Sequence, residues 1–305
     1  MRTLIIHNTA SGAQTDDIFA FERALIGPGD EVVMRTTTPH GPIRALLEDA
    51  TAFDLVVASG GDGTVAEVAY AMRSTGIPVL VFPSGTANLL ANNIGNASEP
   101  AALAATARNG KRVCLDMCEI EYTDDEGTLQ RRGFLNMAGA GYDASIMQGS
   151  TGLKARFGQL AYYLAALGNL DPGVSRFTLS VDGAKLHAEG ICVLVANWGS
   201  LYQSVEFVPD SSPTDGLLDL AVLSAKNSVE LLPALIGSVL RPGEADSYPK
   251  VDFYHAREVV VECDPPFPMQ YDGEVIERAS TPFTARVIPG GFCTLVDALS
   301  PLHSL

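Results

Sequence analysis

The feature that most constrains the fold is an apolar run, Phe53–Ala58, that leads directly into the glycine-rich turn Ser59–Thr64. A helical pattern, Val65–Arg73, follows at once. A strand that is apolar on both faces is typical of a parallel sheet with helices on both sides. Similar strand–loop–helix units precede and follow this one, and their repetition predicts βαβ units on one parallel sheet.

The same pattern predicts the other elements of an N-terminal α/β domain. The expected strands are Thr3–Asn8, Glu31–Thr37, Phe53–Ala58 and Ile77–Phe82, and the expected helices are 16–26, Pro42–Ala50, Val65–Arg73 and Ala87–Ile94. We expect this domain to cover residues 1–110. The C-terminal residues 292–305 are apolar enough to pack back on it.

Further along the chain the pattern changes to short β-rich segments with few helices. The expected strands are 113–122, 129–138, 176–181, 186–197, 217–223, 257–263 and 283–288, and the two helical patterns are 153–168 and 227–240. Asp182-Gly183 and Asp272-Gly273 are suited to hairpin turns. The fold class is therefore α/β + β: a parallel-sheet domain followed by a β-sandwich-like domain over 111–291.

Composition limits the partners and the location of the protein. The 305 residues include 20 Lys+Arg and 36 Asp+Glu, a net charge of −16 that repels nucleic acid and anionic lipid. No apolar run approaches the roughly 18 residues that span a bilayer, and the N-terminus turns polar too early for a signal peptide. Five cysteines, an odd and sparse number, favour a reducing cytoplasm with Cys114 and Cys118 as buried thiols.

Three small-residue loops are expected at one edge of the parallel sheet. They are Asn8–Gly12, Ser59–Thr64 and Pro83–Asn88, each at the carboxyl end of a strand. Such an edge is where open α/β sheets bind ligands. Glycines allow close approach of the backbone, and helix N-termini offer unpaired N–H groups to phosphate. The pattern favours a phosphate-binding site over three plain strand–helix turns.

The glycine-rich turn also indicates what kind of phosphate it binds. No Lys-Ser/Thr follows the glycines, so the turn is not a Walker A motif. Thr64 is expected to cap the following helix, with Glu67 completing a capping box. Asp62 would repel a polyphosphate unless a divalent cation or a ribose-type hydroxyl lay between them. A magnesium nucleotide is therefore favoured over a bare phosphate ester.

The ordered set of motifs closely resembles the diacylglycerol kinase catalytic-domain family, especially its bacterial soluble lipid kinases, which are related to sphingosine kinases. The motifs that carry the resemblance are Asn8–Gly12, Gly60–Thr64 with Glu67, Gly85–Asn88, Asn136–Ala144, Thr214–Asp219 and Asp272–Glu274. In order and approximate spacing they span nearly the whole chain. The resemblance implies an ATP-dependent kinase with ATP and Mg²⁺ as cofactors, which phosphorylates the hydroxyl of diacylglycerol or a related lipid.

The resemblance also implies which residues contact ATP. They are Asn8, Thr9, Ala10, Ser11, Gly12, Thr37, Gly60, Gly61, Asp62, Gly63, Thr64, Glu67, Gly85, Thr86 and Asn88. Among them, Asp62 would help to orient the nucleotide, while backbone N–H groups of the loops hold its phosphates.

The segment Asp272-Gly273-Glu274 has two interpretations. Taken alone, Asp-Gly is a standard hairpin turn. The resemblance places the proton acceptor at Glu274, with Asp272 supporting the magnesium-bound phosphates or orienting the acceptor. Phosphoryl transfer needs positioning, charge neutralisation and a carboxylate that accepts the hydroxyl proton.

The segment Thr214–Leu217 is likewise either a turn before a strand or part of a metal site. The resemblance implies a structural magnesium held by the Asp215 carboxylate and by backbone groups of Ser212 and Leu217. Oxygen ligands suit magnesium, with waters completing its coordination.

One residue departs from the family pattern and leaves alternatives open. Many members have Asp directly after the Asn of the second glycine loop, where this chain has Leu89. A nucleotide-binding regulator with little turnover, a kinase for a sphingoid base and a kinase for a soluble dinucleotide such as NAD are the alternatives.

A lipid kinase must also reach a membrane. The pattern 153–168 begins with two cations and continues with an apolar, aromatic body, which suits a core helix or a lip for acyl chains. Two basic residues contribute only about 2 kcal/mol toward an anionic surface. We therefore expect transient contact with lipid at the membrane surface and no transmembrane segment; a homodimer is a further expected assembly.

Overall fold

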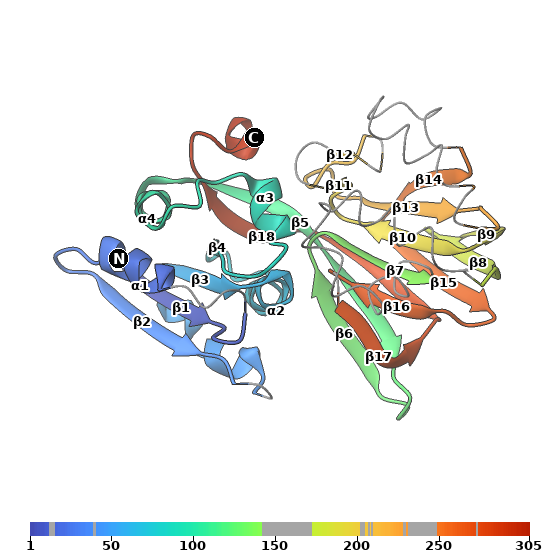
Figure 1. The fold of residues 1–305 in the computed structure, drawn as a ribbon, viewed down its shortest axis with the longest axis horizontal. Helices are drawn as coiled ribbons and strands as arrows, with labels where there is room; N and C mark the ends of the chain where they lie inside the picture. Colours follow the sequence, from blue (N-terminus) through green and yellow to red (C-terminus); the bar gives the residue numbers. More distant parts are fainter. Residues whose placement is uncertain are drawn as a thin grey trace. The chain divides into compact units, whose positions relative to one another are not determined.

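The computed structural model describes residues 1–11, 16–38, 41–141, 173–201, 205–206, 208, 210–227, 230, 249–272 and 274–305. The chain forms two compact units (Figure 1), each described separately below. The first unit is Met1–Met117 with Pro289–Leu305, and the second is Cys118–Ile288.

The first unit contains a four-stranded sheet in the order β2-β1-β3-β4, drawn in blue shades in Figure 1. Its strands are β1 (Arg2–His7), β2 (Glu31–Thr36), β3 (Leu55–Gly60) and β4 (Val79–Pro83). All three pairings are parallel. Every residue of β3 is buried, as expected for a strand that is apolar on both faces. The predicted parallel sheet is confirmed.

Helices of the first unit pack against this sheet and against each other. They are α1 (Asp17–Leu25), α2 (Asp62–Met72), α3 (Leu89–Ile94), α4 (Pro100–Asn109) and the 3₁₀ turns η1 (Ile43–Leu47) and η2 (Ala50–Ala52). The α-helix predicted at 42–50 is wrong in type, because the segment forms 3₁₀ turns. Helix α4 was not predicted; it begins with Pro100, which is well tolerated in a first turn, and buries Leu103 in the same core as Phe21 of α1.

The second unit is built from antiparallel sheets with the orders β14-β13-β10-β7-β16-β17 and β6-β5-β18-β15-β8-β9, plus the pair β11-β12. The strands are β5 (Lys111–Thr123), β6 (Leu129–Phe134), β7 (Met137–Gly141), β8 (Ser175–Val181), β9 (Ala184–Gly190), β10 (Cys192–Ala196), β11 (Ser200–Leu201), β12 (Val205–Glu206), β13 (Leu218–Leu223), β14 (Val251–Ala256), β15 (Glu258–Asp264), β16 (Pro268–Tyr271), β17 (Glu274–Ser280) and β18 (Phe283–Val296). Ile120 and Phe177 of one sheet share a buried core with Val193 and Leu220 of the other. The predicted sandwich-like domain is confirmed.

In the second unit, the sequence predicts the hairpin turns better than it predicts the strands. Asp182-Gly183 joins β8 to β9, with Val181 paired to Ala184. The predicted strand 186–197 is interrupted at Ile191 and forms β9 and β10. Strands β14, β16 and β17 were not predicted. The predicted helix 153–168, and most of 227–240, lie outside the described residues.

The cysteines differ from expectation. Cys114, expected as a buried thiol, is exposed on β5 and forms a disulfide with Cys293 of β18. Cys118 and Cys192 are buried thiols, and Cys263 is a half-buried one. The prediction for Cys114 is wrong because its partner is 179 residues away in the sequence, on a strand that returns to the first unit.

Candidate functional site

The structure brings together the loops that follow β1, β3 and β4 at the carboxyl edge of the parallel sheet. The Asn8 N–H donates to the Ser59 carbonyl at 2.8 Å, and the Ser84 N–H donates to the Gly60 carbonyl at 3.2 Å. The Ser84 hydroxyl lies 3.4 Å from that of Ser11 and 3.3 Å from that of Ser59. These bonds join the three loops into one polar surface.

Two glycines are required by close packing at these loops. A Cβ on Gly85 would lie 2.4 Å from the Gly61 Cα, so a side chain there would push the second and third loops apart. A Cβ on Gly60 would lie 2.5 Å from the Thr64 Cβ, a clash within the second loop. A Cβ on Gly61 would meet the Gly85 Cα at 3.5 Å, an ordinary contact. The glycine pattern therefore serves loop packing as well as any ligand.

The Asn8 side chain connects the first loop to helix α2. Its amide donates to the Thr64 hydroxyl at 2.8 Å, and its side-chain oxygen accepts from the Ala10 N–H at 3.0 Å. The predicted capping box is wrong: α2 begins at Asp62, Gly61 precedes it without a side-chain cap, and Thr64 lies buried inside the first turn. Because Gly61 has no side chain, the residue before α2 cannot cap its first N–H groups, and a helix N-terminus of this kind suits an anion.

Asp62 caps the N-terminus of helix α3. Its carboxylate accepts from the Leu90 N–H at 3.1 Å. Burial raises the pKa of Asp62 above its usual value, and hydrogen bonds from the backbone N–H groups of Leu90, Leu89 and Asn88 partly offset this. Asp62 thus holds the second and third loops together whether or not it also orients a ligand.

The start of α3 explains what Leu89 changes. Asn88 adopts a left-handed conformation with φ 49°, and its side chain both accepts from the Gly85 N–H and donates to the Gly85 carbonyl. Leu89 is then the first helical residue, directly beside the Asp62 carboxylate. An acid at position 89 would place a second negative charge beside Asp62 at this helix end, and Leu89 adds none.

A pocket of about 510 Å³ opens beside these loops, within the usual range of roughly 300–1,000 Å³ for small-molecule sites. It is lined by His7, Thr9, Ser11, Asp16, Ile18, Phe19, Met34, Thr36, Phe82 and Ser84. Phe82 and Met34 give it an apolar wall, and the serines give it a polar one. Such a mixed lining suits a ligand with a flat ring and a phosphate-bearing end.

Several of these residues were missed by sequence reasoning. His7 and Thr36 are the last residues of β1 and β2. Their position at the carboxyl ends of predicted strands is the sequence feature that could have identified them. His7 Nδ1 lies 2.9 Å from the Ser59 hydroxyl, and burial lowers the pKa of His7. Thr37, the predicted contact, donates its backbone N–H to the His7 carbonyl at 3.0 Å.

The other predicted nucleotide contacts are less enclosed. Glu67 and Thr86 have exposed side chains, and Gly63 is the second residue of helix α2. Gly12 lies outside the described residues.

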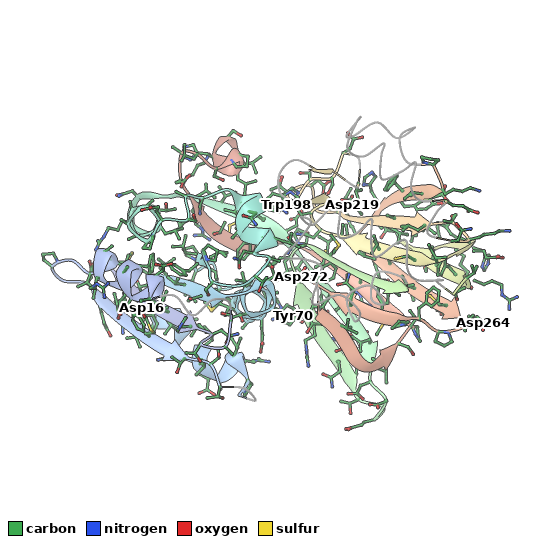
Figure 2. All side chains as sticks on the ribbon, in the orientation of Figure 1. Asp16, Tyr70, Trp198, Asp219, Asp264 and Asp272 are labelled. Atoms are coloured by element: carbon green, nitrogen blue, oxygen red, sulfur yellow. A yellow bond between two sulfur atoms is a disulfide. The ribbon has the colours of Figure 1, made fainter. Side chains whose placement is uncertain are left out.

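In the second unit, Asp272 is almost fully buried, with 6% of its surface exposed. Its carboxylate accepts from the backbone N–H groups of Leu135, Asn136 and Met137 at 2.8, 2.8 and 3.1 Å (Figure 2). Its own N–H donates to the Met137 carbonyl at 2.7 Å, and its φ is 43°. Asp272 therefore has a structural role, because it holds the bend between β6 and β7 against the β16–β17 hairpin.

Glu274, the predicted base, is the first residue of β17, where it pairs with Tyr271. Its side chain, like Gly273, lies outside the described part of the chain.

The bend directly before β7 carries Asn136, which is 2% exposed. Among the described residues, neither the side-chain nitrogen nor the oxygen of Asn136 has a hydrogen-bond partner. No local sequence pattern marks this unsatisfied amide. It is the kind of group that a water or a ligand hydroxyl completes.

The predicted metal loop forms a turn before β13. The Leu217 N–H donates to Asp215 Oδ1 at 2.9 Å, and the Ser212 and Thr214 hydroxyls are 3.2 Å apart. Among the described residues, no group of three His, Cys, Asp or Glu side chains is arranged to hold a metal ion. One exposed carboxylate with nearby backbone oxygens fits a hydrated magnesium in ligand type, provided that waters supply most of its coordination.

Next to this loop, a buried carboxylate contacts an exposed histidine. Asp219 of β13 is 3% exposed, and its Oδ1 is 2.7 Å from Nδ1 of His255 on β14 (Figure 2). Burial raises the pKa of Asp219, while hydrogen bonds from Ser211 and His255 oppose the rise. The Ser211 hydroxyl also accepts from the Gly199 N–H at 2.8 Å. Asp219 thereby fixes one end of the predicted metal loop to the sheet.

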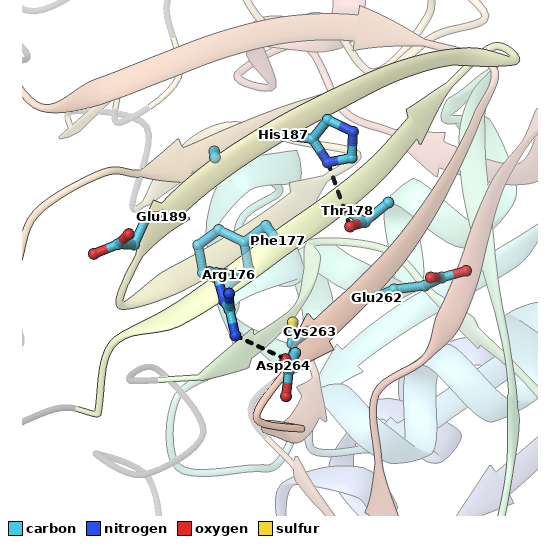
Figure 3. Close-up of a pocket in the computed structure, with 9 residues that line it drawn as sticks. Arg176, Phe177, Thr178, His187, Glu189, Glu262, Cys263 and Asp264 are labelled. Atoms are coloured by element: carbon cyan, nitrogen blue, oxygen red, sulfur yellow. Dashed lines mark hydrogen bonds and ion pairs between the residues drawn. The ribbon is translucent and has the colours of Figure 1, made fainter.

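A second hollow of about 670 Å³ lies on the outer face of β9, β8 and β15 (Figure 3). Two cross-strand contacts line it: Arg176 with Asp264 at 3.1 Å, and Thr178 with His187 at 3.4 Å. It contains none of the residues predicted to bind nucleotide, metal or substrate.

Family comparisons agree with this combination of domains. Residues 2–120 match the diacylglycerol kinase catalytic domain, and residues 136–296 match the YegS C-terminal NAD kinase beta sandwich-like domain. The two domains define the chain as a member of the lipid kinases. Specifically, it belongs to the diacylglycerol kinase catalytic-domain family with a YegS-type second domain.

Relatives cover nearly the whole chain. A diacylglycerol kinase from Bacillus subtilis (strain 168) is 30% identical over 288 residues, 90% of this chain and 89% of the relative. A probable lipid kinase YegS-like protein from Pseudomonas aeruginosa (strain UCBPP-PA14) is 29% identical, covering 98% and 95%. The crystal structure of a diacylglycerol kinase from Bacillus anthracis str. Sterne superposes with a TM-score of 0.75 at 21% identity over 97% of both chains, which shows the shared fold.

No helix in the described part of the chain has both the length and the apolar character needed to span a membrane.

Proposed function

We propose that the protein transfers the γ-phosphate of Mg-ATP to the hydroxyl of diacylglycerol or a related lipid alcohol. The observation that carries this proposal is the pocket at the sheet edge, which is lined by Thr9 and Ser11 of the first small-residue loop and by Ser84 of the third, in a chain of the lipid kinase family. The name of the Bacillus subtilis relative supports diacylglycerol as the acceptor.

The first unit would bind the nucleotide. Phe82 and Met34 would contact the flat base, and N–H groups at the start of α2 would contact the phosphates. Gly85 keeps the second and third loops close together, and Gly60 leaves room for Thr64 in the second. Magnesium, when bound with ATP, would neutralise charge on the transferred phosphoryl group.

The second unit would supply the base. Glu274 would accept the proton from the lipid hydroxyl as its oxygen bonds to the γ-phosphorus. The bond from that phosphorus to the bridging oxygen breaks, and ADP leaves. Asp272 would act indirectly. Its carboxylate accepts three backbone hydrogen bonds and so fixes the hairpin that leads into β17. Asp215, with the backbone of Ser212 and Leu217, would hold a structural magnesium.

We also propose a cytoplasmic enzyme that meets its lipid by transient contact with a membrane surface. The net charge of −16 opposes stable binding to an anionic surface, so the contact would be local and brief. A homodimer remains part of the proposal.

Leu89 favours one alternative, a nucleotide-binding regulator with little turnover. It replaces an acid in the region that Asp62 organises. A regulator would bind Mg-ATP without consuming it, whatever acceptor is added. A kinase for a sphingoid base or for NAD would instead label those acceptors.

The experiment that tests the proposal uses Mg-ATP labelled at the γ-phosphate and mixed micelles of diacylglycerol, sphingoid base or total lipid extract, with NAD as a soluble acceptor. We expect label in diacylglycerol, and a loss of at least about 100-fold in Glu274→Gln, the effect of removing a general base. Glu262→Gln, on the exposed outer face of β15, is the matched control and should keep full activity. Near-normal turnover by a folded Glu274→Gln protein would refute the assigned base.

A further inference from the structure

The C-terminal strap, Pro289–Leu305, is tied to the first unit by the disulfide between Cys293 and Cys114. The strap follows the whole second unit in the sequence. Its residues Phe292 and Val296 are buried. The disulfide thus fixes a segment that the chain adds to the first unit last.

The strap holds the carboxyl end of helix α3. The Ser300 hydroxyl donates to the Ile94 carbonyl at 2.5 Å, and the Asn96 side chain donates to the Leu295 carbonyl at 2.8 Å. The Asp297 carboxylate accepts from the Ala97 N–H at 2.8 Å, and the Asp297 N–H donates to the Asn96 side chain at 2.9 Å. Four hydrogen bonds therefore connect the strap to residues 94–97.

The other end of the same helix organises the loops beside the pocket. The Leu90 N–H is bonded to Asp62, and the preceding Asn88 is bonded twice to Gly85. Helix α3 has only six residues, Leu89–Ile94, so the strap and the glycine loop hold it from opposite ends. A single short helix therefore connects the strap to the loops of the proposed nucleotide site.

The disulfide is placed to react with thiols. Cys114 is exposed, and the Arg112 guanidinium lies 3.6 Å from the Cys293 sulfur, where its charge favours a thiolate. The three free cysteines are less suited to thiol exchange. Cys118 and Cys192 are buried, and burial raises the pKa of Cys263 to about 11. In reducing compartments, disulfides that form are usually redox-responsive.

We propose that Cys114 and Cys293 form a redox-responsive clamp that fixes helix α3 and thereby the nucleotide-binding loops. A thiolate of a dithiol reductant attacks the exposed Cys114 sulfur, the protein disulfide breaks, and Cys293 leaves as a thiolate beside Arg112. The second thiolate of the reductant then displaces Cys114, and both cysteines take up protons. Two electrons pass to the protein, and the reductant becomes a disulfide. Nucleotide regulation by this clamp rests on the proposed function; the clamp itself does not.

The test compares hydrogen exchange of the full chain oxidised by oxidised glutathione, reduced by dithiothreitol, and as Cys114→Ser/Cys293→Ser. We expect amides of 91–97 and 292–300 to exchange at least about tenfold faster in the reduced protein and in the double variant. Amides of β1 should not change. Cys263→Ser, which leaves the clamp intact, should respond to reduction as the native chain does.

A second measurement connects the clamp to the pocket. The dissociation constant of a non-hydrolysable Mg-ATP analogue should be about threefold or more higher in the reduced protein than in the oxidised protein. In the double variant it should be equally high with or without dithiothreitol. If reduction speeds hydrogen exchange but leaves this dissociation constant unchanged, the proposed link between the clamp and the nucleotide loops is wrong. Equal exchange in all three forms, or failure to form the disulfide, would overturn the clamp. Absence of analogue binding in every form would instead reject the proposed function, and the exchange result would still decide the clamp.

Discussion

Asp62 in the first unit and Asp272 in the second are both predicted site residues, and both accept hydrogen bonds from backbone N–H groups. Asp272 is nearly inaccessible and is bound by three such groups on one bend. Asp62 is less enclosed, begins helix α2 and caps the six-residue helix α3. The comparison shows that a carboxylate in a sequence motif can stabilise the backbone by accepting its hydrogen bonds. Asp62, the more accessible of the two, is better placed to contact a ligand.

The largest expected effect is on the stability of the second unit. Asp272→Ala leaves three buried N–H groups without an acceptor, which should lower the free energy of unfolding by roughly 3 kcal/mol or more. Urea denaturation measures this change. Asp264→Ala removes only an exposed ion pair with Arg176 and should cost at most about 0.5 kcal/mol. Equal costs for the two variants would show that Asp272 is not the acceptor that stabilises the bend.

A smaller effect is expected where the glycine loops touch. Gly85→Ala places a Cβ 2.4 Å from the Gly61 Cα, so the loops must separate, at a cost of about 1–3 kcal/mol. Gly61→Ala is the matched control, because its Cβ meets the Gly85 Cα at 3.5 Å. Thermal unfolding should separate the two variants. Similar melting temperatures would mean that loop contact does not explain the second glycine.

The smallest effect concerns the pH dependence of stability through Asp62. Its pKa in the folded protein is above the usual 3.8, so the folded state binds the proton more tightly than the unfolded chain does. Stability attributable to Asp62 therefore falls as pH rises from 3.8 through the raised pKa, and is constant above it. Asp62→Asn should remove this dependence while keeping an acceptor for the Leu90 N–H. Denaturation of both proteins from about pH 4 to 7 measures it, and parallel curves would contradict the raised pKa.

Much of the first unit could be predicted from its sequence, because its signals are local. The apolar run before Ser59 and the glycines after it identify a buried strand and a close turn without reference to distant residues. The capping box failed because Thr64 bonds to Asn8, which is 56 residues away. His7 and Thr36 were missed because a pocket is lined from several strands at once.

In the second unit the determining contacts are longer in range. Strands β14 and β16 have mixed burial patterns that resemble loops until their partners are known. The hairpin at Asp272 was predicted, but the bond from its carboxylate to residues 135–137 was not, since no sequence signal connects positions so far apart. The disulfide of Cys114 is the extreme case, because its partner is 179 positions further along the sequence.

The C-terminal strap has a consequence for how the protein is made. In the sequence, Cys118–Ile288 separates the two parts of the first unit, so Phe292 and Val296 can pack into its interior only after the second unit has been synthesised. Until then, Met1–Met117 has apolar surface uncovered in the nascent chain. A deletion of Pro289–Leu305 would leave the first unit without part of its core.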